Sequence, residues 1–362
     1  MISISKPTIT SEDIRLVTDA VSSGWVSSQG AYIERFEREF ADFCGVRHCV
    51  AVSNGTVAIH LALKVLNIGR GDEVIVPDLT FVATANAVVL AEATPVIADV
   101  RPSDWCLDPE SVESLITPRT RAIIPVHLYG HPAAMDELRT LAQKHKLKII
   151  EDAAEAHGAE YRGRKVGGLG DCATFSFYGN KIITTGEGGA ITTDSGEVAQ
   201  RARFLRDHGM SKERRYWHTE VGYNYRMTNL QAALGVAQLG QIATFLAERA
   251  RILENYRRHL APHGVTLNPH LGDTCPVNWI TCVLLDGVSR EERDLVIARL
   301  HEVGVDTRPF FYPLSALPMY ARKPGPVSVD LSVRGINLPT YPGLPEADIE
   351  RICQTLSGLI QK

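Results

Sequence analysis

Short apolar runs alternate with longer amphipathic stretches between about residues 50 and 195. Runs such as Val74-Ile75-Val76 and Ala122-Ile123-Ile124 are apolar at every position, which is typical of strands buried on both faces of a sheet. The predicted strands are Glu73–Val76, Pro95–Val100, Arg121–Leu128, Lys148–Asp152, Ala173–Phe177 and Gly189–Thr193. The predicted helices are Thr56–Leu66, Thr80–Ala91, Pro109–Ile116 and Met135–Lys146. This alternation predicts an α/β layered domain with a mainly parallel sheet.

The pattern changes after a long helical stretch near Asn229–Leu260, which ends before the breaker Pro262-His263-Gly264. Beyond it we predict a strand, a helix, a further strand and a closing helix, at Asn278–Leu285, Arg290–Val303, Val305–Arg308 and Glu346–Ile360. The chain is also too long for one ordinary core. We therefore predict a large domain over residues 1–245 and a small α+β domain over residues 246–362.

The amino-acid composition and charge disfavour several classes of function. Of the 362 residues, 44% are apolar and 22% are charged, with a formal net charge of −4, which is typical of a soluble globular protein. No Lys/Arg run is dense enough for a nucleic-acid surface, and no apolar run approaches the roughly 18 residues of a membrane helix. Residues 1–7 lack the features of a signal peptide. Seven scattered cysteines without a CxxC pair favour a reduced, cytoplasmic compartment, and we predict no metal.

A turn of small polar residues, Ser53-Asn54-Gly55-Thr56, precedes the helix that is predicted to end near Leu66. Such a turn leaves backbone N–H groups free at the helix start, where the helix dipole favours an anion. Thr56 adds a hydroxyl donor. The alternative is a plain helix cap, because Ser, Asn and Thr are ordinary cap residues. The turn alone does not decide between a phosphate site and a plain helix cap.

The strand Lys148–Asp152 ends in carboxylates, and Glu155 follows three residues later. In α/β sheets, ligands bind at the carboxyl ends of the strands. A buried carboxylate at that edge is costly unless it meets a cation, so Asp152 is a candidate partner for a cationic ligand. A capping or salt-bridging Asp152 is the alternative, and the strand taken alone favours it.

Lys181 lies between Phe175-Ser176-Phe177 and the glycine-rich turn Gly186-Glu187-Gly188-Gly189. A lysine in this setting can be partly desolvated, which favours the neutral amine that Schiff-base chemistry requires. The glycines allow the backbone to approach a flat ring closely. A lone lysine is usually a solvated loop residue, but these flanking segments favour the chemical role.

On these residues the sequence resembles the sugar-nucleotide aminotransferases, a DegT-type branch of the fold-type I pyridoxal-phosphate enzymes. The resemblance spans nearly the whole chain and is most specific at Phe175–Gly189. Further motifs that carry it are Trp25–Gly30, Ser53–Thr56, His127–Gly130, Glu151–Glu155, Gly222–Asn229 and Arg308–Pro313. It implies a large three-layer α/β/α domain with a mainly parallel sheet, followed by a small C-terminal α+β domain.

The resemblance also implies pyridoxal 5′-phosphate as the cofactor and two catalytic residues. Lys181 would bind the cofactor aldehyde covalently, and Asp152 would pair with the ring nitrogen. The other implied cofactor contacts are Phe81 stacked on the ring, Gly55, Thr56 and Ser176 at the phosphate, Glu155 beside the ring, and Asn224 from a neighbouring subunit. The family often has Gln or His at position 155, whereas the branch that aminates a GDP-linked sugar has Glu. A contact made by Asn224 across subunits implies a homodimer or a dimer of dimers.

The implied substrate contacts are Trp25, His127, Arg308, Tyr312 and Tyr320, although aromatic and arginine side chains are also common packing anchors. The implied reaction moves the amino group of glutamate to a nucleotide-linked 4-keto-6-deoxy sugar. GDP-4-keto-6-deoxymannose is favoured, and its product, GDP-perosamine, is a 4-amino sugar of lipopolysaccharide O-antigens.

Several alternatives stay open at this point. A UDP- or dTDP-linked 4-keto sugar, or a 3-keto sugar, shares the same motifs, and antibiotic glycosylation is a second possible pathway. Sugar dehydratases of this fold have His where this chain has Lys181, so the lysine favours transamination. The intact Asp152 and Lys181 disfavour a non-catalytic regulator. The absence of HExxH and CxxC spacings disfavours a metal hydrolase.

Overall fold

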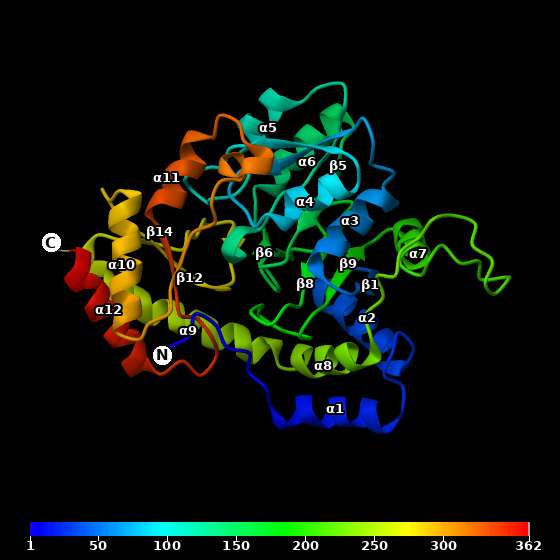
Figure 1. Ribbon diagram of the computed structural model, residues 1–362, viewed down its shortest axis with the longest axis horizontal. Helices are drawn as coiled ribbons and strands as arrows, with labels where there is room; N and C mark the ends of the chain where they lie inside the picture. Colours follow the sequence, from blue (N-terminus) through cyan, green and yellow to red (C-terminus); the bar gives the residue numbers. More distant parts are fainter. Residues whose placement is uncertain (361–362) are drawn as a thin grey trace.

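The computed structural model describes residues 1–360, and its larger part is built on a seven-stranded sheet (Figure 1). In sheet order the strands are β1 (His48–Val52), β9 (Gly189–Thr193), β8 (Cys172–Ser176), β5 (Lys148–Asp152), β4 (Thr120–Ile123), β2 (Glu73–Pro77) and β3 (Thr94–Ala98). Neighbours pair in parallel from β3 to β8, whereas β9 is antiparallel to both β8 and β1. The predicted mainly parallel sheet is confirmed.

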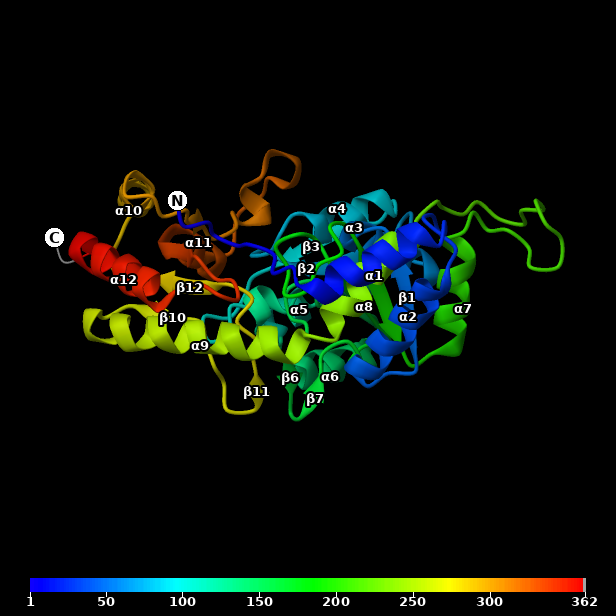
Figure 2. The ribbon, with the colours of Figure 1, turned by 90° about the horizontal axis from the view of Figure 1, so that it is seen from below.

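Helices cover both faces of this sheet. Successive side chains of a strand point to opposite faces, so Val74 and Val76 belong to one apolar cluster and Ile75 to the other. The first cluster includes α3 (Gly55–Val65), α4 (Ala83–Leu90) and α7 (Gly196–Leu205). The second includes α2 (Ala31–Cys44), α5 (Pro109–Leu115), α6 (Met135–His145) and α8 (Asn229–Leu239). The three-layer α/β/α prediction is confirmed, and α1 (Ser11–Ser22) packs on α8 outside these layers (Figure 2).

The long helical stretch predicted over Asn229–Leu260 is two helices instead of one. Helix α8 ends at Leu239, and α9 (Ile242–Leu260) starts after Gly240 and Gln241, with a bend of 61° between the two axes. Glycine is a poor helix former because it loses the most conformational freedom when it is fixed. The break redirects α9 out of the large part of the molecule and along the small one, as both ribbon views show (Figures 1 and 2).

The small part has its own sheet and its own core. The strands in order are β10 (Thr266–Leu267), β12 (Thr281–Leu284), β14 (Gly335–Leu338) and β13 (Arg308–Pro309), all antiparallel. The helices beside them are α10 (Arg290–Glu302), α11 (Pro326–Arg334) and α12 (Glu346–Ile360). Ile2 joins this core through a parallel bridge to Val305. The predicted boundary at 245/246 falls inside the unbroken helix α9, so the division into residues 1–245 and 246–362 stays a proposal.

Some predicted bounds differ from the observed ones for physical reasons. The strand predicted over Arg121–Leu128 ends at Ile123, because Pro125 has no N–H to donate to a sheet ladder. The amphipathic helices α1, α2, α7 and α11 were not predicted. A third small sheet joins the two parts of the molecule, and its strands are β11 (Thr274–Cys275), β6 (Glu160–Tyr161) and β7 (Arg164–Lys165).

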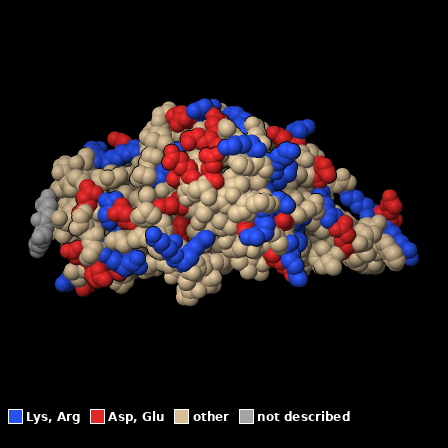
Figure 3. Space-filling model, turned by 90° about the horizontal axis from the view of Figure 1, so that it is seen from above, with Lys and Arg blue, Asp and Glu red and all other residues tan. Residues whose placement is uncertain are grey.

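Residues 207–226, here called the arm, form a loop whose middle part extends away from the rest of the chain beyond α7 (Figures 1 and 2). At its base, Tyr223 and Tyr225 pack against the cluster that includes α3. Tyr216, Trp217 and Val221 on the arm are exposed apolar side chains. Charges of both signs are spread over the face in Figure 3, and on the arm as well. Within residues 1–360, no individual helix has the length and apolar composition of a membrane span; α8 with 242–263 meets that criterion only as a bent pair.

Candidate active site

A cavity of about 590 Å³ opens where the ends of β5 and β8 meet the first turn of α3. This volume is typical of a small-molecule site. The segment that follows β2 closes one side of it, and Trp279 and Phe311 reach it from the C-terminal part of the chain. The cavity therefore lies at the carboxyl edge of the parallel strands, where α/β sheets bind ligands.

The first turn of α3 forms one end of this cavity. Asn54 caps the helix, since its Oδ1 accepts the N–H of Val57 at 3.0 Å, and Gly55 and Thr56 line the cavity. A Cβ on Gly55 would lie 2.8 Å from the Cβ of Ser176. Only glycine lets the helix start approach Ser176 this closely. The start of α3, with its dipole, and the hydroxyl-bearing residues Thr56 and Ser176 thus lie at the same end of the cavity, which suits a phosphate.

Asp152 lies at the end of β5 and is buried. Its Oδ2 accepts the hydroxyl of Thr84 at 2.8 Å, and its Oδ1 accepts the N–H of Ala154 at 3.2 Å. Burial raises the pKa of Asp152, and these two hydrogen bonds oppose the rise. A carboxylate in this position is stabilised by a cationic ligand.

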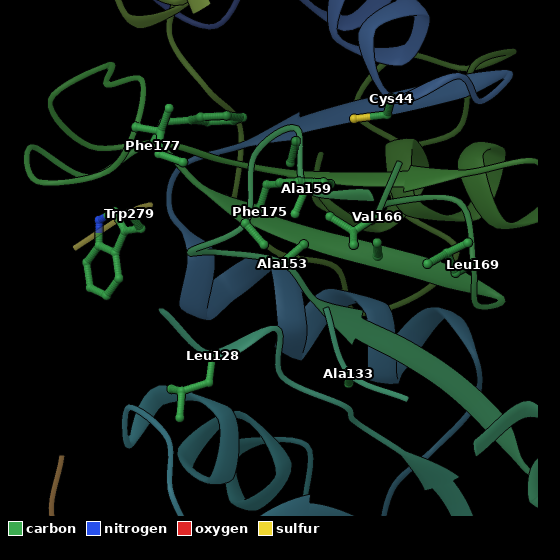
Figure 4. Packing of buried hydrophobic residues seen from close by; sticks show 14 of the residues in the cluster. Cys44, Leu128, Ala133, Ala153, Ala159, Val166, Leu169, Phe175, Phe177 and Trp279 are labelled. Atoms are coloured by element: carbon green, nitrogen blue, oxygen red, sulfur yellow. The ribbon is translucent and has the colours of Figure 1, made fainter. Parts of the chain in front are cut away.

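Lys181 follows the turn after β8, and its side chain is 12% exposed. Its Nζ lies 3.7 Å from Oε1 of Glu155 and 4.2 Å from the ring centre of Trp279. The indole N–H of Trp279 donates to the carbonyl of Asn180 at 2.8 Å, which holds the ring against the amine. Trp279 belongs to the apolar cluster around Phe175 and Phe177, at the edge of which it lies in Figure 4.

Glu155 is a second buried carboxyl group beside Lys181. Its Oε2 accepts the N–H of Tyr129 at 2.9 Å, in a turn where Tyr129 has a left-handed φ of 51°. Burial raises the pKa of Glu155 to about 7, although the charge of Lys181 and the Tyr129 N–H oppose the rise. Near neutral pH, Glu155 can therefore hold or release a proton next to Nζ.

The structure brings most of the predicted cofactor contacts together. The cavity lining contains Gly55, Thr56, Phe81, Asp152, Glu155, Ser176 and Lys181. Asn224 instead lies on the arm, is exposed, and accepts a hydrogen bond from Nη2 of Arg226 at 3.1 Å. It lies outside the lining of its own chain's cavity, as expected for a residue that acts on a neighbouring subunit. The individual roles of these residues stay predictions.

His127, a predicted substrate contact, is fully buried and lies outside the cavity lining. Nδ1 accepts the N–H of Ala133 at 3.0 Å, which leaves Nε2 to donate to Glu151 at 3.2 Å. Glu151 in turn accepts the N–H groups of Gly167, Leu169 and Gly170. Both ring nitrogens of His127 are therefore used inside the protein, and its contact with a substrate stays a prediction.

The other four predicted substrate contacts also lie outside the lining in this single chain. The hydroxyl of Tyr320 donates to Oδ1 of Asn86 at 2.7 Å, so it joins two parts of the protein. Arg308 pairs with Asp306. Tyr312 is 44% exposed and lies beneath the guanidinium of Arg290, and Trp25 is 55% exposed. A substrate contact for Trp25, Arg308, Tyr312 or Tyr320 stays a prediction.

Several lining residues were not predicted, among them Phe311, Thr84 and Trp279. Phe311 is the sequence neighbour of Tyr312 and lies in the same predicted motif, Arg308–Pro313. Thr84 follows Phe81 by three residues, and helical spacing could have indicated it. Trp279 lies nearly 100 residues from Lys181 in sequence, and no local pattern indicated it.

Comparison with known proteins agrees with this geometry. The DegT/DnrJ/EryC1/StrS aminotransferase family matches residues 7–357. GDP-perosamine synthase of Caulobacter vibrioides is 48% identical, covering 99% of this chain and 98% of that protein. GDP-perosamine synthase of Vibrio cholerae is 42% identical, with 99% of each chain covered. The PLP form of Spr1654 from Streptococcus pneumoniae superimposes with a TM-score of 0.95 at 28% identity, covering 99% of this chain and 98% of that one.

The chain belongs to the DegT/DnrJ/EryC1/StrS aminotransferase family. It is an enzyme, and its cofactor is pyridoxal phosphate. The residues present fit that group. The first turn of α3 with Ser176 suits the phosphate, the buried Asp152 suits a protonated ring nitrogen, and Lys181 presents an amine between them.

Proposed function

We propose that this enzyme transfers the amino group of glutamate to GDP-4-keto-6-deoxymannose and forms GDP-perosamine. The observation that carries the aminotransferase chemistry is the amine of Lys181, held in the cavity 3.7 Å from Glu155. The choice of sugar nucleotide rests on the 48% and 42% identity, over nearly the whole chain, to proteins named GDP-perosamine synthase. The cytoplasmic location expected from the sequence stays a prediction.

Bound pyridoxal phosphate supplies an aldehyde for the donor's amine and an electron-withdrawing ring. The residues of this chain do the rest. Nζ of Lys181, once it is free of the cofactor, accepts the proton from the α carbon of glutamate. The same nitrogen would deliver this proton to the cofactor carbon that carried the aldehyde. In the second half-reaction it would take a proton from that carbon and deliver it to C4 of the sugar. Glu155 lies within reach of Nζ, so the charge of the lysine changes beside a group that can itself hold a proton.

Asp152 and the start of α3 orient the reacting groups. Asp152 would accept a hydrogen bond from the protonated ring nitrogen and keep it charged, while Thr84 and Ala154 hold the carboxylate in place. Gly55, Thr56 and Ser176 would hold the phosphate. One cavity serves both half-reactions, so glutamate becomes 2-oxoglutarate before the keto sugar becomes the amino sugar. This order predicts ping-pong kinetics.

A substrate panel tests the proposal. The loaded enzyme is incubated with glutamate and, separately, with the GDP-, UDP- and dTDP-linked 4-keto-6-deoxy sugars and with a 3-keto sugar nucleotide. Mass spectrometry and NMR identify the amino product and the carbon that carries nitrogen. We expect the GDP sugar to have the highest kcat/KM and to yield a 4-amino product. A higher kcat/KM for another nucleotide, or amination at C3, would refute the substrate assignment.

We also propose that the active form is a homodimer, or a dimer of dimers, in which Asn224 contacts the cofactor phosphate of the neighbouring subunit. Asn224 is exposed at the base of the arm and lies outside the lining of its own chain's cavity, and the arm exposes Tyr216, Trp217 and Val221. Exposed aromatic and apolar side chains on a projecting segment are typical of a surface that another chain covers.

Mixed dimers test the crossing of Asn224. Lys181→Ala and Asn224→Ala are each expected to be inactive as homodimers. If Asn224 acts across the interface, a dimer of one chain of each kind has one site with both changes and one site with neither. The mixed dimer, purified through two different tags, should therefore recover about half of the wild-type activity per dimer. A mixed dimer as inactive as its parents would place Asn224 in its own subunit's site.

A further inference from the structure

Two carboxylates outside the cavity, the buried Asp78 and the half-buried Asp99, hold the C-terminal part of the chain on the sheet. Asp78 directly follows β2, and Asp99 directly follows β3, so both lie at the carboxyl edge from which the cavity opens. Residues 311–328, here called the crossing segment, pass over this edge and run from just after β13 into the first turn of α11. The carboxylates accept hydrogen bonds from the crossing segment and do not line the cavity themselves.

Asp78 is 1% exposed and accepts four hydrogen bonds from the crossing segment. Its Oδ1 accepts the N–H of Ser315 at 2.8 Å. Its Oδ2 accepts the hydroxyls of Ser315 at 2.8 Å and Ser328 at 2.6 Å, and the N–H of Gly325 at 3.3 Å. The carbonyl of Asp78 accepts the N–H of Leu314 at 2.8 Å. Hydrogen bonds to an ionised acceptor are stronger than neutral ones, so the crossing segment is firmly fixed at residues 314–315.

These bonds lie next to two aromatic residues of the cavity. Phe81 follows Asp78 by three residues, and Phe311 precedes Ser315 by four. Both rings line the cavity, with their centres 5.8 Å apart. Phe81 lies in the segment that directly follows strand β2, whereas Phe311 comes from the C-terminal part of the chain. The contacts of Asp78 therefore connect the two sides of this aromatic wall.

We propose that Asp78 is a positioning residue that holds Phe311 against Phe81 and thereby fixes the wall along which the sugar nucleotide reaches the amine. Glutamate is small and needs only the inner end of the cavity. The sugar nucleotide is large and must also pass the aromatic pair. Displacing Phe311 should therefore weaken binding of the sugar nucleotide and leave the reaction with glutamate nearly unchanged. This inference rests on the proposed function for the identity of the large substrate.

Asp99 provides a matched control. It is a carboxylate on the adjacent strand end and accepts the N–H groups of Val327 at 3.0 Å and Ser328 at 2.9 Å at the start of α11. These bonds are similar in length to those of Asp78, which accepts the hydroxyl of the same Ser328, but Asp99 has no bond to Ser315. Its bonds lie far from Phe311 along the chain. Asp99→Asn should loosen the crossing segment at α11 without moving the aromatic wall.

The test compares Asp78→Asn, Ser315→Ala and Asp99→Asn in the cofactor-loaded enzyme. Each half-reaction is followed separately by stopped-flow absorbance, with glutamate and with the sugar nucleotide that the wild type aminates best. We expect KM for the sugar nucleotide to rise roughly tenfold in Asp78→Asn and about threefold in Ser315→Ala, with the glutamate half-reaction within about twofold of wild type. Asp99→Asn should leave KM for the sugar nucleotide and the rate of the glutamate half-reaction within about twofold of wild type.

Hydrogen exchange gives a readout that does not depend on the substrate. The amides of Leu314 and Ser315 should exchange faster in Asp78→Asn and Ser315→Ala than in wild type, and unchanged in Asp99→Asn. Three outcomes would overturn the inference. The rates of both half-reactions could fall equally in Asp78→Asn, or Asp99→Asn could have as large an effect as Asp78→Asn. The third is unchanged hydrogen exchange at the amides of Leu314 and Ser315. If Asp78→Asn does not fold, the same two measurements on Ser315→Ala decide whether the inference holds. A wild type inactive on the whole panel would refute the proposed function, and the exchange measurement would still decide this inference.

Discussion

The inner end of the cavity and its aromatic wall are built in different ways. At the inner end, Asp152, Glu155 and Lys181 come from two neighbouring strands, β5 and β8, and the turns that follow them. Polar contacts hold these groups, such as Thr84 to Asp152 and Tyr129 to Glu155. The wall instead combines Phe81 with two residues from the C-terminal part of the chain, Trp279 and Phe311.

This difference suggests separate roles for the two regions: the inner end carries out the reaction, and the wall selects the substrate. The inner end has the amine and the carboxyl groups, which the reaction of every amino donor and acceptor uses. The wall has apolar rings, whose positions depend on how the two parts of the molecule pack together. Changes at the inner end should therefore reduce kcat in both half-reactions, whereas changes in the wall should act mainly on the larger substrate.

Lys181→Ala is expected to have the largest effect. Removing the amine removes the covalent link to the cofactor and the base that moves the proton, so kcat should fall by at least about 10³-fold. Borohydride reduction of the loaded wild type, followed by peptide mapping, should label Lys181, and the variant should show no label. Lys148→Ala is the control, since its exposed Nζ pairs with Asp171 away from the cavity. A label on another lysine of the wild type would overturn the assignment.

Asp152→Asn should have the second-largest effect. The amide keeps the shape of the side chain but cannot stabilise a protonated ring nitrogen, so we expect kcat to fall on the order of 10²-fold. The cofactor content after gel filtration, measured by absorbance, should fall much less than the rate. Equal activity in Asp152→Asn and wild type would show that the ring-nitrogen role is mistaken.

The two regions also differ in how well the sequence predicts them. Asp152 and Lys181 lie in contiguous motifs in which an apolar strand ends in a polar residue or a glycine-rich turn, so local pattern and family resemblance both indicate them. The edge of a parallel sheet then brings them together. The strand bounds Lys148–Asp152 and Gly189–Thr193 were predicted as observed for the same reason.

The wall could not be predicted in this way, because its members meet only through tertiary packing. Trp279 precedes β12 and has no sequence neighbour in the cavity. The partner of His127, the buried Glu151, could not be identified from the sequence either, because the two side chains meet only in the folded chain. The break at Gly240 was missed because the apolar stripe continues across it, while the backbone changes direction.

Trp279→Phe tests the wall with a smaller change. The variant keeps a ring near Lys181 but loses the hydrogen bond from the indole N–H to Asn180. We expect kcat/KM for the sugar nucleotide to fall roughly fivefold, the equivalent of one hydrogen bond. Trp279→Ala, which also removes the ring, should lose more. If Trp279→Ala has wild-type kinetics with both substrates, the ring does not hold Lys181 in position.

The smallest expected effect is on the pH dependence of protein stability. It compares Glu155, at the inner end of the cavity, with a glutamate at the exposed rim. The pKa of Glu155 is about 7 in the folded chain, above the ordinary value of 4.5, chiefly because the group is buried. Between these two values the folded chain keeps a proton that the unfolded chain has released. The folded state therefore loses stability as pH rises from 4.5 to 7 and stays at the lower level above 7.

Replacing Glu155 with Gln removes this pH-dependent loss, which is on the order of 3 kcal/mol. In cofactor-free protein, the Tm of Glu155→Gln relative to wild type should therefore be higher at pH 8 than at pH 5, by roughly 5 °C. Other groups titrate in the same range, including His157, whose pKa burial lowers to about 3. They are common to both proteins, so they cancel in the difference. Glu187→Gln, the same substitution at the exposed rim of the cavity, is the matched control. A Glu155→Gln difference that does not change between pH 5 and pH 8 would mean that Glu155 is ionised in the folded chain throughout this range.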